Sequence, residues 1–165
     1  MKIIISIVFL LICFFGVTRI YAQDIEVKIN PLFIPLNTLQ LNVEYLLGKR
    51  FGLEPGVLYS PTQKGNKSAY LIGKYYLIPS LKGHDRLYAG IFGSHHFGTN
   101  DANVLGFYLG YKYLYLKALS FEAGIGNGLD ITDGIPLKNF GVYHQFFLGI
   151  GYRFDIKKDK ENIIN

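Results

Sequence analysis

The sequence predicts an all-β protein: an eight-stranded antiparallel transmembrane β-barrel with up-and-down topology. The first supporting observation is the alternation along residues 142–154, where even positions are mostly apolar and odd positions are mostly small, polar or charged. Because successive side chains of a strand point to opposite faces, one face suits lipid and the other suits a polar interior. The second observation is that the chain after residue 22 has no apolar run long enough for a spanning helix. A membrane protein without such helices has to be a closed barrel.

Eight segments carry strand-like patterns, and each has about 9–11 residues or slightly more, as a tilted membrane strand requires. They are residues 24–32, 38–47, 51–60, 69–78, 86–97, 104–116, 119–128 and 141–155. The alternation is clearest in the second segment, where Gln40, Asn42 and Glu44 share one face and the odd positions are mostly apolar. In the fourth segment, only Lys74 indicates which face points inward.

The connections between these segments alternate in length. Three are short, at residues 48–50, 79–85 and 117–118. The other four are mostly longer and rich in Gly, Pro, Asn and Asp, at residues 33–37, 61–68, 98–103 and 129–140. In outer-membrane barrels the short turns face the periplasm and the longer loops face outward. With a periplasmic N-terminus, the same arrangement is expected here, with a barrel of residues 23–156 and a short charged periplasmic tail of residues 157–165.

The first 22 residues have the pattern of a cleaved export signal. Lys2 precedes an apolar run over residues 3–17, and Ala22 is a small residue at a suitable cleavage point. The alternative is a membrane anchor, but the run is shorter than the about 20 residues that a spanning helix needs. Cys13 lies inside the run and is interpreted as part of it rather than as a lipidation site. We therefore expect export to the cell outer membrane.

Removal of this signal leaves a chain with little net charge and no cysteine. The formal charge falls from +5 to +3, with 15 basic and 12 acidic side chains remaining. An excess this small and scattered indicates no nucleic-acid partner. The single cysteine leaves with the signal, so no disulfide is available. The length suits one domain.

Charged residues recur on the face opposite to the apolar one. They are four acids and five bases: Glu26, Glu44, Glu54 and Glu122, with Lys28, Lys74, Arg86, Lys112 and Arg153. Because buried charges persist only when they are paired, this near-balanced set predicts an interior ion-pair network. The alternative is that the charges lie on the solvated surface of a soluble sheet. In the barrel, Leu109 faces the bilayer and Gly110 faces the interior, with room for a small polar side chain.

The final strand carries a further pattern: Gly149, two residues, Tyr152, one residue and Phe154. It resembles the assembly-machinery recognition pattern of the small OmpA/OmpX-type outer-membrane barrels and of related uncharacterised barrels of Gram-negative bacteria. Phe147 stands where that pattern usually has a polar residue. Residues 28–32 and 41–45 also look like the opening hairpin of those uncharacterised barrels. The resemblance implies the barrel fold, an outer-membrane location, and contacts with membrane lipid and the barrel-assembly machinery. It implies no active-site residues.

Ser94, His95 and His96 form the cluster most suggestive of catalysis, with Glu122 on a later strand. Some eight-stranded outer-membrane barrels are lipid A deacylases that use Ser, His and Glu, but their motif places the serine after the histidine with one residue between. Neighbouring strand residues also point to opposite faces, which argues against a metal shared by His95 and His96. We therefore expect no catalytic, metal-binding or cofactor-binding residues and no cofactor.

The leading functional hypothesis is a non-catalytic structural or interaction barrel of the outer membrane. Its outer loops, above all residues 129–140, would form the contact surface, and the extracellular or periplasmic partner stays unidentified. Three alternatives remain: a small pore or transport barrel, a soluble lipocalin-like barrel with its apolar face inward, and a lipid-modifying outer-membrane enzyme. Eight strands leave little room for an open lumen, which argues against the pore.

Overall fold

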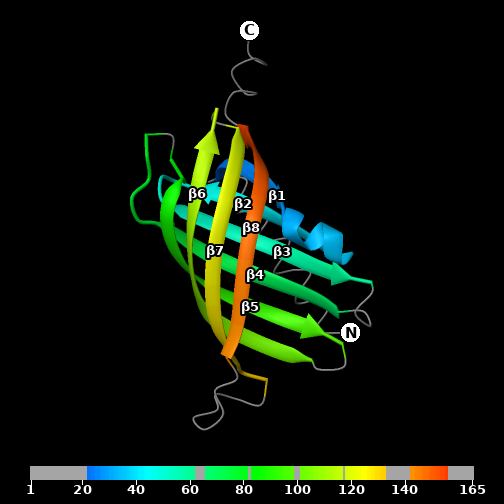
Figure 1. The fold of residues 1–165 in the computed structure, drawn as a ribbon. Helices are drawn as coiled ribbons and strands as arrows, with labels where there is room; N and C mark the ends of the chain where they lie inside the picture. Colours follow the sequence, from blue (N-terminus) through cyan, green and yellow to red (C-terminus); the bar gives the residue numbers. More distant parts are fainter. Residues whose placement is uncertain are drawn as a thin grey trace, which may run out of the picture.

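The structure, a computed structural model, is a closed barrel of eight antiparallel strands in chain order, with β1 paired to β8 (Figure 1). It describes residues 22–61, 66–81, 83–98, 101–116, 118–132 and 142–155. The strands are β1 (Ala22–Ile29), β2 (Leu39–Leu47), β3 (Phe51–Ser60), β4 (Asn66–Tyr76), β5 (Arg86–Phe97), β6 (Ala102–Tyr115), β7 (Leu119–Asp130) and β8 (Val142–Asp155). The predicted all-β, up-and-down barrel is confirmed. Residues 1–21 of the expected signal, the charged tail and most of the loop at residues 129–140 lie outside the described residues, and Ala22, the last residue of the expected signal, begins β1.

The first connection differs from the prediction, which continued the first strand to Leu32. A short 3-10 helix, η1 (Pro31–Leu36), begins directly after Asn30. The side-chain oxygen of Asn30 accepts a hydrogen bond from the backbone N–H of Leu32 at 3.1 Å, and Pro31 has no N–H to donate to a strand ladder. The backbone therefore leaves the sheet, and Asn37 ends the helix in the left-handed conformation, at φ 52°. No helix in the described part of the chain is long and apolar enough to cross a membrane.

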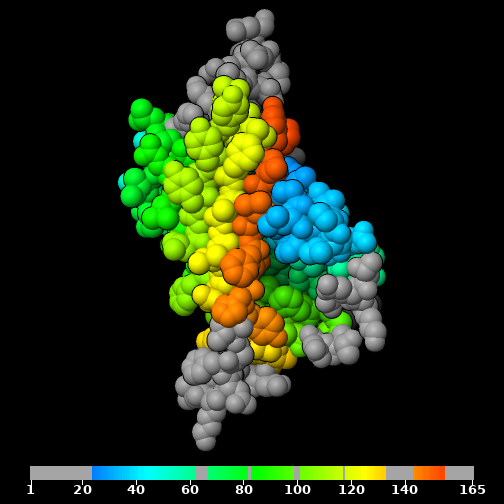
Figure 2. All heavy atoms as spheres, in the orientation of Figure 1, coloured from blue at the N-terminus to red at the C-terminus, as the bar shows by residue number. Residues whose placement is uncertain are grey.

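Side chains alternate between a buried inner face and an exposed outer face. In β6 the alternation is uninterrupted from Ala102 to Tyr115. Large apolar side chains occupy outer positions on all eight strands, and Phe107 and Phe146 are 77% and 70% exposed. Figure 2 shows β6, β7 and β8 as one continuous wall, with η1 bulging beside β8. Large apolar side chains thus cover the outer face, whereas the charged side chains of the strand interiors and a set of aromatic rings face inward. A lipocalin-like barrel would instead turn its apolar face inward.

Aromatic rings fill the middle of the barrel, and glycines on neighbouring strands make room for them. The buried cluster consists of Tyr70, Ile72, Tyr76, Tyr88, Phe92, Val104, Tyr108 and Phe147. A Cβ atom on Gly110 would collide with the ring of Tyr88, so the expected room for a small polar side chain at Gly110 does not exist. Gly124 lies against the ring of Tyr108 in the same way. A barrel this narrow accommodates such rings only where the adjacent residue has no side chain.

The two ends of the barrel differ. The closed end carries the turns that follow β2, β4 and β6, and the segment between β4 and β5 folds over it. In that segment the carboxylate of Asp85 accepts from the backbone N–H and the hydroxyl of Ser80 at 2.7 and 2.6 Å. His84 is buried, and its ring meets the ring of Tyr76 edge-on at 5.4 Å between centroids. The opposite, open end carries η1 and the starts of β2, β4, β6 and β8.

Candidate functional site

The charges of the inner face meet in one group, which we call the ion cluster. It contains eight of the nine predicted residues: Glu26, Lys28, Glu44, Glu54, Lys74, Lys112, Glu122 and Arg153. Each is at most 6% exposed. The ninth, Arg86, is exposed, so its assignment to the interior was wrong. Arg86 is the first residue of β5, at the rim of the barrel, and its left-handed backbone (φ 65°) takes the side chain out of the alternation.

Lys28 stands at the centre of the ion cluster. Its Nζ lies 2.5 Å from Glu54 Oε2 and 2.5 Å from Glu122 Oε2, and it also pairs with Glu44. An ammonium group has three donors, so these three carboxylates use all of them. Because the four residues come from β1, β2, β3 and β7, one buried side chain links four strands.

Lys74 and Lys112 add further links across the barrel. Lys74 Nζ lies 2.5 Å from Glu122 Oε1 and 2.6 Å from Glu54 Oε2. Lys112 Nζ lies 2.5 Å from Glu44 Oε2. The inward face of the fourth strand is therefore the one that Lys74 indicated.

Arg153 joins the ion cluster to the segment that covers the closed end. Its Nε and Nη2 donate to Glu26 Oε2 at 3.2 and 3.1 Å. Its Nη1 and Nη2 donate to the backbone carbonyls of Gly83 and His84 at 3.2 and 3.0 Å. Burial lowers the pKa of His84 below its ordinary value, so the imidazole is neutral near pH 7 and does not repel the guanidinium. The planar guanidinium of Arg153 thus connects the ion cluster to the backbone of the segment that covers the closed end.

Tyrosine hydroxyls also donate to carboxylate oxygens of the ion cluster. Tyr76 Oη donates to Glu44 Oε1 at 2.5 Å, and Tyr88 Oη donates to Glu122 Oε1 at 2.5 Å. The ring of Tyr108 stacks on that of Tyr88 at 6.0 Å, but its buried hydroxyl has no partner among the described residues. The stacked rings of Tyr88 and Tyr108 therefore differ: the hydroxyl of Tyr88 is hydrogen-bonded and that of Tyr108 is not, within the described residues.

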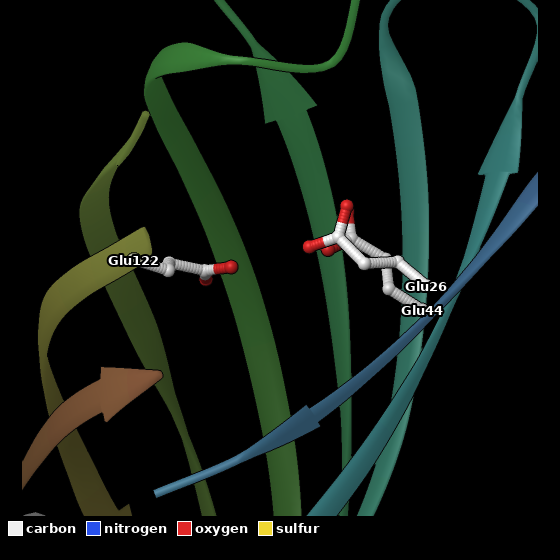
Figure 3. Close-up of side chains that lie close together, drawn as sticks. All are labelled: Glu26, Glu44 and Glu122. Atoms are coloured by element: carbon white, nitrogen blue, oxygen red, sulfur yellow. The ribbon is translucent and has the colours of Figure 1, made fainter. Parts of the chain in front are cut away.

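Three of the acids are close enough together to suggest a metal site. Oxygens of Glu26, Glu44 and Glu122 lie within 4.8 Å of one another. Figure 3 shows Glu26 and Glu44 pointing from β1 and β2 toward Glu122 on β7. The lysines of the ion cluster, however, already pair with these carboxylates. Four carboxylates meet three ammonium groups and one guanidinium, so the cluster is formally neutral and needs no cation. Its chemistry is that of a structural ion-pair network.

A chain of hydrogen bonds leads from the ion cluster to the open end. The amide of Asn42 donates to Glu54, and Tyr70 Oη donates to Asn42 Oδ1 at 2.6 Å. Gln40 Nε2 then donates to Tyr70 Oη at 2.5 Å, and Asn30 Nδ2 donates to Gln40 Oε1 at 2.8 Å. Sequence reasoning placed Gln40 and Asn42 on the inner face without giving them a role. The signal that could have identified them is that they share this face with the acids.

The residues of the predicted assembly pattern lie on β8 but not on one face. Tyr152 and Phe154 point outward, with their rings 4.9 Å apart. Gly149 faces inward, where a Cβ atom would collide with the ring of Phe147. Phe147, which stands where the pattern usually has a polar residue, is 5% exposed and belongs to the aromatic core. The glycine therefore has a packing role that is independent of recognition.

His95 and His96 point to opposite sides of β5. Ser94 Oγ lies 3.3 Å from His96 Nε2. His95 Nδ1 lies instead 2.8 Å from Asn103 Oδ1. Within the described residues no carboxylate hydrogen-bonds to His96, and Glu122, the acid considered with it, pairs with lysines. The structure thus brings Ser94 and His96 together. The acid nearest in effect among the described residues is Asp130, which interacts with His96 electrostatically but accepts its hydrogen bonds from Thr132. No described carboxylate is therefore hydrogen-bonded to the imidazole as in a catalytic triad.

The open end contains a cavity of about 200 Å³, which sequence reasoning missed. Its polar lining residues include Gln40, Ser68, Tyr70, Ser94, His96 and Gln145. These residues come from β2, β4, β5 and β8, so the cavity exists only because the sheet closes. Alternation could have shown that each faces inward, but not that they surround one space.

Comparison with known proteins gives a family for the chain. The family model described as "Protein of unknown function (DUF3575)" matches residues 7–101, which is more than half of the chain. The chain belongs to this family. In this DUF3575 member the match extends through β5 and includes Glu26, Lys28, Glu44, Glu54 and Lys74 of the ion cluster. No match was found among curated proteins or among solved structures.

Proposed function

We propose that this protein is a non-catalytic β-barrel of the outer membrane, exported by the signal at residues 1–22 and inserted by the barrel-assembly machinery. Its strands cross the lipid, its closed end faces the periplasm, and its open end faces outward. The longer loops at the open end are the contact surface for a partner. The resemblance to the OmpA/OmpX-type barrels is part of the same proposal.

The outer surface is the observation that carries this proposal. Every strand exposes at least one large apolar side chain, and most expose several. The exposed charged side chains of the described residues lie at strand ends or in connections, and they are Lys49, Arg50, Lys67, Arg86 and Asp101. A continuous apolar surface of this extent is unusual on a soluble monomer and suits the hydrocarbon layer of a bilayer.

The interior argues against the alternatives. Aromatic rings and the ion cluster fill the barrel, which leaves no open path for a pore through the described residues. Outward apolar side chains argue against a soluble lipocalin-like barrel. Ser94 and His96 lie without a hydrogen-bonded acid among the described residues, which argues against a lipid-modifying enzyme.

The test is to express the full chain with its own N-terminus in a Gram-negative host and to separate the membranes. We expect the mature protein in the outer-membrane fraction. We also expect the unheated form to migrate differently from the boiled form on a gel, because a closed barrel resists detergent until it is heated. A soluble periplasmic protein, followed in the same fractions, controls for leakage.

Two observations together would contradict the membrane assignment. A mature chain that stays soluble without detergent, and migrates identically before and after boiling, would remove the membrane assignment. The barrel fold would then have to expose its apolar surface to water or bury it in an oligomer.

A further inference from the structure

The cavity at the open end differs in chemistry from the rest of the polar interior. The ion cluster lies toward the closed end, and none of the side chains that line the cavity is an Asp, Glu, Lys or Arg. Its polar lining residues carry amide, hydroxyl and imidazole groups. Because an unpaired charge is costly to bury, a cavity of this kind selects a neutral ligand.

Two of the lining groups have unused hydrogen-bonding capacity. Ser68 is buried at the start of β4, and Gln145 is half-buried near the start of β8. Neither side chain has a hydrogen-bond partner among the described residues, and neither contributes a buried atom that lacks one, so their polar atoms are accessible in the cavity. A hydroxyl can donate and accept, and an amide can do both at once. These groups are therefore free to bind the hydroxyls of a ligand.

The remaining walls are aromatic or aliphatic. The ring of Tyr143 stacks on that of His96 at 5.8 Å with 22° between the planes, and Phe92 forms part of the cavity wall. A ligand that fits has apolar faces for these rings and hydroxyls around its edge. The volume of about 200 Å³ is below that of pockets for drug-sized ligands, which are roughly 300–1,000 Å³, so it suits one small ring.

We propose that the open end of the barrel binds a neutral sugar ring, either a free monosaccharide or the terminal unit of a glycan. Ser68 and Gln145 bind ring hydroxyls, and His96, held by Ser94, contributes a further ring nitrogen at the edge of the site. The aromatic walls cover the apolar faces of the ring. The proposal goes beyond the proposed function and needs only the barrel fold, not its location.

The test uses residues 23–165 folded in a detergent without a sugar headgroup. Saturation-transfer NMR and tyrosine fluorescence titration measure binding of glucose, methyl β-D-glucopyranoside and N-acetylglucosamine. Glucuronate and glucosamine serve as the anionic and cationic analogues of similar size. We expect saturable binding of at least one neutral sugar and at least tenfold weaker binding of both charged analogues.

His96→Ala and His95→Ala form a matched pair, because the residues are adjacent and lie on opposite faces of β5. We expect His96→Ala to weaken binding at least tenfold and His95→Ala to change it less than twofold, with the heat-dependent gel shift intact in both. Gln145→Leu should reproduce the loss. If methyl β-D-glucopyranoside binds as tightly as glucose, the ligand is the terminal unit of a glycan. If the methyl glycoside binds more weakly than glucose, the ligand is a free monosaccharide.

Absence of binding by all three neutral sugars to a barrel that keeps its gel shift would overturn the proposal. Equal binding of the charged analogues, or equal losses in His95→Ala and His96→Ala, would also overturn it. If the unmodified protein lacks the gel shift, the barrel fold and the proposed function fail. If it keeps the gel shift and binds no neutral sugar, only the sugar-binding proposal fails.

Discussion

At the closed end of the barrel, four buried carboxylates meet four cations, and Arg153 extends the network to the backbone of residues 83 and 84. At the open end, the side chains that line the cavity include no Asp, Glu, Lys or Arg, and two of them have no hydrogen-bond partner among the described residues. Both ends are built from inner-face positions of the same strands.

The difference shows how the kind of polar group determines what the interior can do. A buried charge has to be fully paired, so the closed end is cross-linked and sealed. A neutral group costs only about 1–3 kcal/mol when it is left unpaired, so the open end can keep groups available for a ligand. The same barrel therefore has a closed end cross-linked by ion pairs and an open end whose polar groups are available to a ligand.

The largest expected effect is at the centre of the ion cluster. Lys28→Met removes one of the two lysines that pair with Glu44, Glu54 and Glu122, and leaves Lys74 as the other. Four buried carboxylates then face three cations, and removing one partner from a buried ion pair costs about 3–5 kcal/mol. Denaturant unfolding of the detergent-folded barrel measures the loss. Lys49→Met, on an exposed turn of the same end, is the control and should change stability little. Equal losses in the two variants would mean that the ion cluster does not hold the closed end together.

The next largest effect is expected on the outer surface, which is apolar toward both ends of the barrel. Leu109 lies on the outer face near the middle of β6. Leu109→Arg should destabilise the barrel in lipid by about 2–4 kcal/mol, because an arginine near the bilayer midplane is poorly solvated. Leu109→Met is the apolar control. Folding in lipid vesicles measures both, and an arginine variant as stable as the methionine variant would contradict the inside–outside assignment.

A smaller effect separates two stacked tyrosines between the ends. Tyr88→Phe removes one of the two donors to Glu122 Oε1, the other being Lys74, and should cost about 1.5–3 kcal/mol as the loss of a hydrogen bond to a charged group. Tyr108→Phe removes a hydroxyl without a partner among the described residues and should cost nothing or stabilise the barrel. Thermal unfolding compares the two. A larger loss in Tyr108→Phe would show that its hydroxyl is bonded.

The smallest effect on stability is expected at the seam between β8 and β1. Phe154 pairs with Ile25 there and exposes its ring on the outer face. Phe154→Ala should change unfolding little but lower the amount of barrel in the outer membrane, because it removes the last aromatic residue of the assembly pattern. Controls are Lys138→Ala, outside the described residues, and deletion of residues 157–165. Normal levels of Phe154→Ala, with loss only on the deletion, would place the end of the barrel elsewhere.

The sequence by itself determined the number of strands, their order and the face on which most side chains lie. β3 and β5 have their predicted bounds, and Lys74 indicated the inner face of β4 correctly. The reason is that alternation is a local property of an extended backbone, which each strand shows without reference to its neighbours. The exceptions lie at strand ends: Arg86 left the alternation at the rim, and Pro31 left the sheet.

Only the tertiary structure decided which inner-face residues meet. Closure of the sheet brings Lys28 of β1 to Glu122 of β7, places Tyr88 over Gly110, and surrounds the cavity with residues from separate strands. These contacts depend on strand register and on the width of the barrel, which are properties of the whole sheet. No single strand contains that information, so the pairing of charges and the space for a ligand appear only when the barrel closes.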